Sequence, residues 1–339
     1  MKVSIDKTLE LTLLKLSSLG REIQRGLYPY KILKELGDLG LYASFYKEGQ
    51  KGFVEAFNNI ALISKTCVNT GFCVWAQLVL NYYLLHSHYG DKPLFRQIAY
   101  GEILGGSGLS NALKSFAGIE ANKLRAKGDS KGYIINGTLP YVSNLGALEQ
   151  GRNVSIFAFI AMAKSGHIMG LARCCELRLK DRDEFCAFKG SATKSVVFKD
   201  YCLPFSDVLS LSASSFAAKV APGFVLLQVA LSAGVTCGAL QSLEKHQPHI
   251  AKTLEDKRQV LYDRALRLAK NPTKSRFKAI LRLKIAFANL ALKATQMALL
   301  CAQSKGYKEE SKECKMALEA IFCANISPSF SHIQRILGS

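Results

Sequence analysis

The spacing of the hydrophobic residues changes twice along this chain, and the change constrains the fold more than any single motif. From residue 2 to about residue 105 the apolar side chains recur at helical spacing. From about residue 106 to residue 210 they form short alternating runs, and from residue 216 onward helical spacing returns. The sequence therefore predicts an α+β fold, mostly α, with helices at residues 1–106, an antiparallel sheet or small barrel at residues 107–210 and a helical bundle at residues 211–339.

Two long segments without charged residues predict buried helices. The segment from Cys67 to Leu85 contains polar residues such as Asn69 and Gln77, so a buried helix pair is a better interpretation than a membrane span. The segment from Ala221 to Leu243 carries small residues that allow close helix contact, and it is predicted to be the central helix of the bundle. No membrane span is therefore expected.

The cysteines and the first residues favour a cytoplasmic protein. The ten cysteines include no CxxC pair, which indicates buried free thiols in a reducing compartment and neither a disulfide framework nor a zinc site. The histidines lack the converging partners that a metal site needs. Residues 1–25 interleave charges with leucines at helical spacing, unlike a signal peptide, so a first amphipathic helix is expected there.

A basic block from Lys257 to Lys284, where Asp263 is the one acidic residue, supplies a good part of the formal net charge of +19. Such a block can attract nucleic acid, anionic lipid or a phosphorylated cofactor through its summed field. No nucleic-acid-binding motif accompanies it. A solvated helix face is the preferred interpretation, and nucleic acid stays the alternative partner.

The segment from Tyr133 to Asn144 reads Tyr-Ile-Ile-Asn-Gly-Thr-Leu-Pro-Tyr-Val-Ser-Asn. Asn136 and Gly137 can adopt the positive φ values of a type I′ turn, so the segment is predicted to form a small hairpin. Its second arm offers an aromatic ring, a backbone peptide and a hydroxyl. That combination suits a planar, hydrogen-bonding ligand, and it equally suits a sheet edge.

Together with Leu109-Ser110-Asn111 and the segment from Ser191 to Leu209, this stretch resembles the acyl-CoA dehydrogenase family. That family has a Leu-Thr-Glu-Pro flavin loop, an Asn-Gly-x-Lys-x-Trp-Ile-Thr-Asn strand and a Phe-x-x-Val-x-Val-Pro segment, in the same order and with similar spacing. The resemblance covers most of the chain. It implies an acyl-CoA dehydrogenase-like fold with a middle antiparallel β-barrel, FAD as cofactor, a small-molecule substrate such as an acyl-CoA, and a homodimer or homotetramer.

The resemblance also implies site residues. Ser110 stands at the threonine of the flavin loop, Tyr141 at the tryptophan of the strand, and Ser143 at a threonine whose hydroxyl is directed at the flavin. The implied cofactor-binding residues are Leu109, Ser110, Ser115, Tyr141, Val142 and Ser143. Trp75 and Gln77 lie on the helical segment that would cover the substrate, and Trp75 is alternatively a core residue.

Several positions depart from the family pattern. Asn111 and Ala112 replace the Glu-Pro of the flavin loop, and Gln303 and Ser304 replace two glycines of a Gly-Gly-x-Gly-Tyr segment. The Arg-x-x-Phe-Gly segment, which contacts the flavin diphosphate in the family, has no clear counterpart. FMN in place of FAD, or no flavin at all, therefore stays open.

The carboxylate base of the family is missing. Pro328 takes the place of the glutamate in its Tyr-Glu-Gly-Thr loop, and the alternative seat on the central helix is Leu227 followed by Gln228. No catalytic residue is therefore assigned. Three functions stay open: a flavin-dependent oxidoreductase without this base, including a monooxygenase; a dehydrogenase that uses Glu120 or His332; and a non-catalytic binder that uses the basic block.

Overall fold

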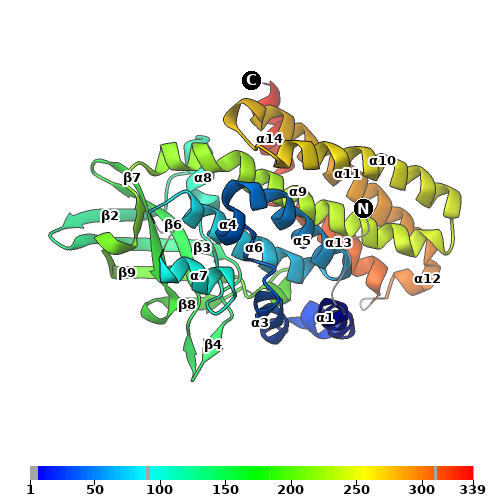
Figure 1. Cartoon of the computed structure of the whole chain (residues 1–339), viewed down its shortest axis with the longest axis horizontal. Coiled ribbons are helices and arrows are strands. Elements are labelled where there is room, and N and C mark those ends of the chain that lie inside the picture. The colour runs from blue at the N-terminus through cyan, green and yellow to red at the C-terminus, as the bar shows by residue number, and fades with distance from the viewer. Residues whose placement is uncertain (1–6, 89–91, 183, 309–310, 339) are drawn as a thin grey trace.

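The computed structural model describes residues 7–88, 92–182, 184–308 and 311–338. Helices fill the first part of the chain, strands the middle and helices the last part, as the spacing predicts (Figure 1). One hydrophobic core contains side chains from all three parts, for example Trp75, Met169 and Leu227. Because the core is shared, the predicted division into three domains stays a prediction.

The first part of the chain is a set of helices around the buried helix α6. They are α1 (Lys7–Ser18), α2 (Gly20–Arg25), α3 (Tyr30–Asp38), α4 (Ser44–Glu48), η1 (Gly49–Gly52), α5 (Phe53–Thr66), α6 (Val68–Leu85) and α7 (Pro93–Ala99). The expected helix over residues 1–25 is thus two helices, and residues 1–6 lie outside the described part. The predicted helix pair at 67–85 is wrong: after the extended Cys67, one continuous helix buries nearly all of its residues.

The middle part forms a mixed sheet. Its strands are β1 (Gly105–Ser107), β2 (Leu124–Asp129), β3 (Gly132–Val142), β6 (Ile156–Ala163), β7 (Gly166–Arg173), β8 (Arg178–Asp181), β9 (Lys194–Pro204) and β10 (Val208–Ser210), in the order β10-β7-β6-β2-β3-β9-β8 with β1 beside β6. The pairs β1–β6 and β2–β6 are parallel. Among the described residues β10 does not pair with β8, so this sheet is open, whereas an antiparallel barrel was expected. A separate ribbon joins β4 (Leu148–Glu149) to β5 (Arg152–Asn153), and helix α8 (Ser110–Phe116) follows β1.

The predicted hairpin turn at Asn136 and Gly137 is wrong. Both residues lie inside the continuous strand β3. The chain turns at positions 130–131, between the end of β2 and the start of β3. Asn136 instead stabilises a β-bulge in β9: its side chain donates to Asp200 Oδ1 at 3.0 Å and accepts from Asp200 N at 2.9 Å. Gly137 has a φ of 129°, and a Cβ there would lie 2.1 Å from the carbonyl oxygen of Lys123. The Asn-Gly pair therefore serves a bulge and not a turn.

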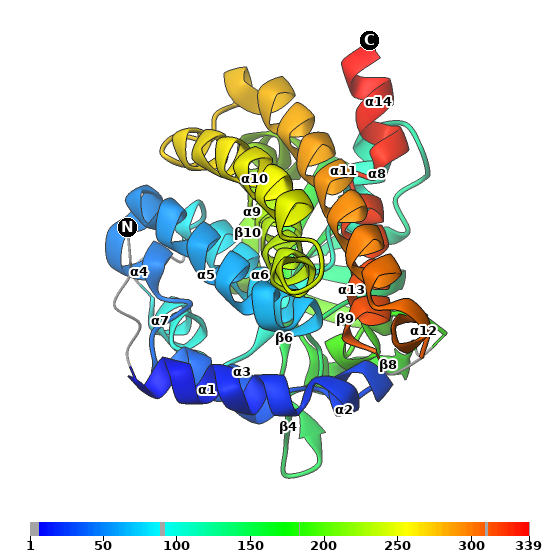
Figure 2. The same cartoon turned by 90° about the vertical axis from the view of Figure 1, so that its right-hand side faces the viewer.

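The last part is a helical bundle built around α9. Its elements are α9 (Ala213–Glu244), α10 (Pro248–Ala269), η5 (Lys274–Arg276), α11 (Phe277–Cys301), α12 (Gln303–Gly306), α13 (Lys312–Asn325) and α14 (Phe330–Gly338). Helices α5, α10, α11 and α13 pack around α9 (Figure 2). By length and composition, α9 and the segment Lys274–Cys301 could each cross a membrane, but 94% of the apolar window of α9 is buried inside the fold. Helix α9 is therefore the central core helix that the sequence predicts.

Candidate functional site

Four of the predicted site residues converge on one cavity of about 240 Å³. Trp75 comes from α6, Ser110 from the start of α8, and Tyr141 and Ser143 from the end of β3 and the residue after it. Helices α9 and α13 complete the wall. A larger cleft of about 890 Å³ lies between α1, α2 and α13, but none of the predicted site residues lines it.

Gln77, predicted to contact substrate, is fully buried and holds backbone together. Its side-chain nitrogen donates to the carbonyl oxygens of Ile98 and Ile103 at 2.8 and 2.9 Å, and its oxygen accepts from Gly105 N at 2.7 Å. The side-chain amide of Gln77 therefore fixes the chain between α7 and β1. Gln77 is not among the residues that line the cavity.

The other three predicted cofactor residues do not line the cavity. Leu109 and Val142 are buried core side chains, at 1% and 0% exposure, so only their backbone groups could face a ligand. Ser115 lies in the last turn of α8 and is half-buried.

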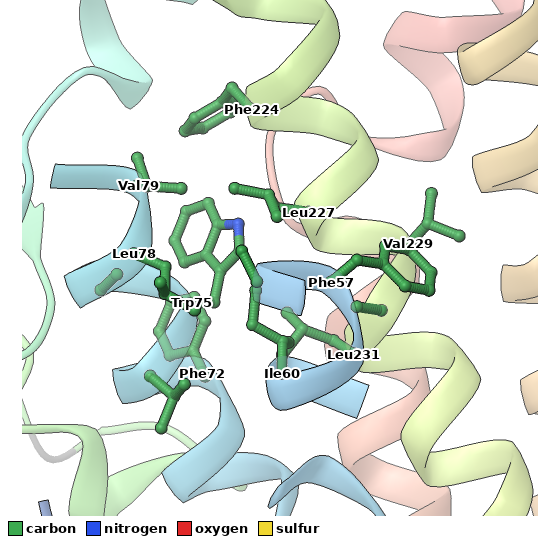
Figure 3. Close-up of a cluster of buried hydrophobic side chains, with 14 of the residues drawn as sticks. Phe57, Ile60, Phe72, Trp75, Leu78, Val79, Phe224, Leu227, Val229 and Leu231 are labelled. Carbon is green, nitrogen blue, oxygen red and sulfur yellow. The ribbon is translucent and has the colours of Figure 1, made fainter. Parts of the chain in front are cut away.

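One side of the cavity is aromatic. The ring of Trp75 stacks on Phe72 with centroids 5.2 Å apart, and it meets the ring of Phe224 from α9 in an edge-type contact with centroids 5.3 Å apart. Figure 3 shows the indole nitrogen on the side of the ring that faces α9, close to Leu227. This nitrogen is buried and has no hydrogen-bond partner in the described part of the chain. Leu227 is not among the residues that line the cavity, so this N–H lies against the packed core.

Two further rings narrow the cavity. Phe188 and Phe322 stack with centroids 3.9 Å apart. Phe188 has a φ of 64°, an uncommon backbone conformation outside glycine that is concentrated at functional sites. The volume of about 240 Å³ lies below the roughly 300–1,000 Å³ of ordinary ligand pockets. The cavity therefore has the size of one compact ring system.

A chain of hydroxyl groups forms the polar side of the cavity. The Ser143 and Thr193 hydroxyls are 2.7 Å apart, and those of Thr193 and Ser191 are 2.8 Å apart. The Ser191 hydroxyl donates to the carbonyl oxygen of Phe188 at 2.6 Å. Sequence reasoning missed Ser191 and Thr193, although both lie in the Ser-Ala-Thr that opens the segment 191–209 matched to the family.

A clamp of two side chains holds the loop after α13, which forms the third side of the cavity. Lys284 Nζ donates to Gln228 Oε1 at 2.6 Å and to the carbonyl oxygens of Ile326 and Pro328 at 2.9 and 2.8 Å. Gln228 Nε2 donates to the carbonyl oxygen of Ser327 at 2.9 Å. The Ser327 hydroxyl in turn accepts from Ser110 at 3.1 Å. Three successive carbonyl groups of the loop are thus fixed.

Lys284 corrects the interpretation of the basic block as one solvated face. It is 3% exposed, and burial lowers the pKa of its ammonium group to about 7. Its position was detectable in the sequence, because Ile280, Lys284, Phe287 and Ala291 share one face at helical spacing and all are buried. The block also includes exposed residues on the end of α10, on the start of α11 and in the segment between them, which are Arg264, Arg267, Lys270, Lys274, Arg276, Lys278 and Arg282.

Among the described residues that line the cavity there is no aspartate, glutamate or histidine. Glu120 accepts a hydrogen bond from Asn111 at 2.9 Å, outside the lining, and His332 lies on α14. Glu319 is buried on α13, but it lies beside Lys315 at 3.8 Å and accepts from Asn69 N at 3.3 Å. Burial raises the pKa of the Glu319 carboxyl. The sequence has no carboxylate at positions 227 and 328. The other described residues of the cavity lining do not supply one either.

Comparison with known proteins gives the fold. No protein-family model and no curated protein sequence matches the chain. Solved structures match over its whole length. Butyryl-CoA dehydrogenase from Megasphaera elsdenii aligns with a TM-score of 0.81 at 16% identity, over 100% of this chain and 99% of that chain.

Two other solved structures extend the comparison. A glutaryl-CoA dehydrogenase from Mycobacterium smegmatis in complex with FADH2 aligns with a TM-score of 0.75 at 14% identity, over 98% of this chain and 94% of that chain. Nitrososynthase from Micromonospora carbonacea var. africana aligns with a TM-score of 0.78 at 16% identity and the same coverage. The chain therefore has the acyl-CoA dehydrogenase fold, as the resemblance implied, in a form that has diverged far in sequence.

Proposed function

We propose that the cavity holds the ring of a flavin, FAD or FMN, and that the protein is a cytoplasmic flavin-dependent oxidoreductase acting on a small hydrophobic substrate, such as an acyl-CoA or a related molecule. One observation carries the proposal: Trp75, Ser110, Tyr141 and Ser143, far apart in the sequence, line the same hollow. Aromatic faces with a few polar groups are the surroundings that a planar heterocycle needs. When bound, the flavin would serve as a two-electron acceptor.

The residues of the cavity fit such a ring. The stacked rings of Phe72 and Trp75 give the cavity an aromatic side, and the Ser143 and Thr193 hydroxyls give it a polar side. Tyr141 extends the aromatic surface at the rim, beside Phe185 and under the guanidinium of Arg182 at 5.1 Å. The Lys114 side chain, which also lines the cavity, would hold a phosphate group.

The described lining contains no carboxylate, which favours one reaction type over the other. Proton removal next to a thioester carbonyl needs a positioned base, and the Gln228 and Ser327 side chains that occupy this wall do not accept a proton at neutral pH. An oxygen-activating reaction at a reduced flavin needs no such base. We therefore favour monooxygenase-type chemistry over α,β-dehydrogenation.

Flavin binding is the first test. FAD and FMN are titrated into the purified protein while flavin fluorescence and the melting temperature are followed, and stabilisation should grow with flavin concentration. Tyr141→Ala is expected to weaken binding roughly tenfold, because about 1.4 kcal/mol of ring contact is lost. Tyr133→Ala is the matched control, since Tyr133 lies on the same strand but contacts Phe205 away from the cavity. If neither flavin changes either signal at saturating concentration, the proposal is wrong.

A further inference from the structure

The large cleft between α1, α2 and α13 ends at a cluster of buried polar groups. Lys315 and Glu319 of α13 line both this cleft of about 890 Å³ and a small hollow of about 10 Å³ that adjoins it. Asn69, near the start of α6, lines the hollow and is 1% exposed. A hollow of this size has room for one group as large as a water molecule. The end of a ligand that lies in the cleft can therefore enter it.

The side-chain amide of Asn69 is unpaired. Its oxygen and its nitrogen are both buried, and neither has a hydrogen-bond partner among the residues that the structure describes. Buried polar groups are nearly always paired, because an unpaired amide in the interior is costly. Asn69 therefore offers both an acceptor and a donor to a molecule that fills the hollow.

The ion pair beside Asn69 also has capacity for further contacts. Lys315 Nζ lies 3.8 Å from Glu319 Oε1, and its contacts with the carbonyl oxygen of Gly20 and with Cys67 Sγ are both 3.4 Å long. The buried Lys284, in contrast, donates to its three acceptors at 2.6, 2.9 and 2.8 Å. Both contacts of the Glu319 carboxyl use Oε1, and in the described part of the chain Oε2 makes none. A cation and a carboxylate oxygen thus remain open to a ligand.

The outer part of the cleft is partly apolar. Leu13 and Leu14 of α1 and Met316 of α13 line it, and Leu14 is 66% exposed. One cleft therefore combines an apolar wall with a deep end that carries both signs of charge. Only a ligand with the same combination of groups can use all of these contacts.

We propose that this cleft is a second ligand site, which binds a free α-amino acid with an apolar side chain. The carboxylate of the amino acid pairs with Lys315, its ammonium group pairs with Glu319, and the Asn69 amide bonds to both. Its side chain lies on the wall formed by Leu14 and Met316. The site is separate from the flavin cavity and goes beyond the proposed function.

Three probes of similar shape test whether both charges are needed. L-leucine carries an ammonium group and a carboxylate, 4-methylpentanoate lacks the ammonium group, and 3-methylbutylamine lacks the carboxylate. Equilibrium dialysis against the purified protein, without added flavin, measures the binding of each probe. Because one hydrogen bond to a charged group is worth roughly tenfold or more in affinity, L-leucine should bind at least that much more tightly than either of the others.

Asn69→Leu separates ligand binding from stability. The two side chains have the same number of heavy atoms, and leucine leaves no polar atom unpaired, so the melting temperature should not fall while L-leucine binding weakens roughly tenfold. Asn81→Leu, on the same helix, is the matched control. The Asn81 side chain donates to the carbonyl oxygen of Tyr42 at 3.1 Å, so this change should lower the melting temperature and leave L-leucine binding as it is.

Glu319→Gln keeps the size of the side chain and removes the charge that would hold the ammonium group. This variant should lose the preference for L-leucine over 4-methylpentanoate. Melting curves establish which variants are folded, and either Asn69→Leu or Glu319→Gln suffices for the test.

The preference for L-leucine over both single-charge probes, lost in these two variants and kept in Asn81→Leu, supports the inference. Equal binding of the three probes, no binding at millimolar concentration, or undiminished binding by folded Asn69→Leu overturns it. Because the dialysis contains no flavin, none of these results bears on the flavin cavity. A protein that binds L-leucine but no flavin would overturn the proposed function alone.

Discussion

At the scale of single residues, the side chain with the most unusual environment is Lys284, a buried cation surrounded by the oxygens of Gln228, Ile326 and Pro328. Burial lowers its pKa to about 7, against about 10.4 in an unfolded chain. Between these two values the unfolded chain binds a proton that the folded chain does not. The contribution of Lys284 to the free energy of unfolding therefore rises as the pH increases from about 7 to about 10, and is least favourable below pH 7.

Lys284→Met tests this assignment. The ammonium group donates three hydrogen bonds, and the neutral amine above pH 7 donates at most two. The change removes these bonds and also removes the cost of burying a charge, which is present only while the lysine is protonated. We expect the variant to be less stable than the parent by on the order of 1–3 kcal/mol at pH 9, with a smaller difference at pH 6. Urea denaturation at the two pH values measures it, with exposed Lys278→Met on the same helix as control. A difference that is the same at both pH values would show that the folded pKa is not depressed.

At the scale of elements, the loop between α13 and α14 is the place where the carboxylate base is missing. Its residues Ile326 and Ser327 line the cavity, while the carbonyl groups are held by the clamp from α9 and α11. The loop is thus rigidly placed but brings no carboxylate to the cavity.

Anaerobic addition of straight-chain or branched acyl-CoA thioesters to the flavin-loaded protein should leave the flavin absorbance unchanged.

Ser327→Glu should create such a base where the parent has a hydroxyl. A positioned base contributes roughly 10²- to 10⁴-fold in rate, so slow bleaching of the flavin by a short acyl-CoA is expected for this variant. Ser329→Glu is the matched control, because Ser329 belongs to the same loop but contacts Ser331 outside the cavity. Rapid bleaching by the unmodified protein would contradict the claim that it does not catalyse α,β-dehydrogenation.

The helices, strands and turns also show which features the sequence could predict and which it could not. Periodicity located α9 and the long strands β3, β6, β7 and β9, because burial of one face imposes a spacing that is visible in the sequence. It misplaced the turn at Asn136 and Gly137, since a positive-φ glycine suits a bulge as well as a hairpin, and only the long-range contact with Asp200 distinguishes them. The same limit applies to the site. Tyr141 and Ser143 were found through the motif, whereas the Ser191 to Thr193 contacts depend on how a loop folds back.

At the scale of the whole molecule, the resemblance implied the fold before any contact was known, and the full-length structural match agrees with it. Closure of the sheet could not be read from the sequence, because strand length and alternation are the same in an open sheet and in a barrel. The packing of α9 inside the bundle explains why its uncharged length does not require a membrane. What the bundle leaves uncovered is the outer groove between α10 and α11.

This groove leads to the last prediction, a homodimer or homotetramer assembled through the C-terminal bundle. The groove has a volume of about 720 Å³, its apolar lining includes Leu254, Val260 and Leu290, and Val260 is 66% exposed. Asp256 and Lys293 stand at the same surface, so two copies related by a two-fold axis can bring opposite charges together around the apolar centre.

Light scattering at micromolar concentration should therefore give at least twice the monomer mass. Val260→Lys places a charge in the centre of the contact from both sides of the two-fold axis. If each copy loses about 1.4 kcal/mol, the association constant falls roughly 100-fold. Leu211→Lys is the matched control, because Leu211 is 65% exposed but lies before α9, away from the groove. A parent protein that is monomeric at these concentrations would refute the prediction. An oligomer that survives Val260→Lys but dissociates with Leu211→Lys would place the interface on the other end of the bundle.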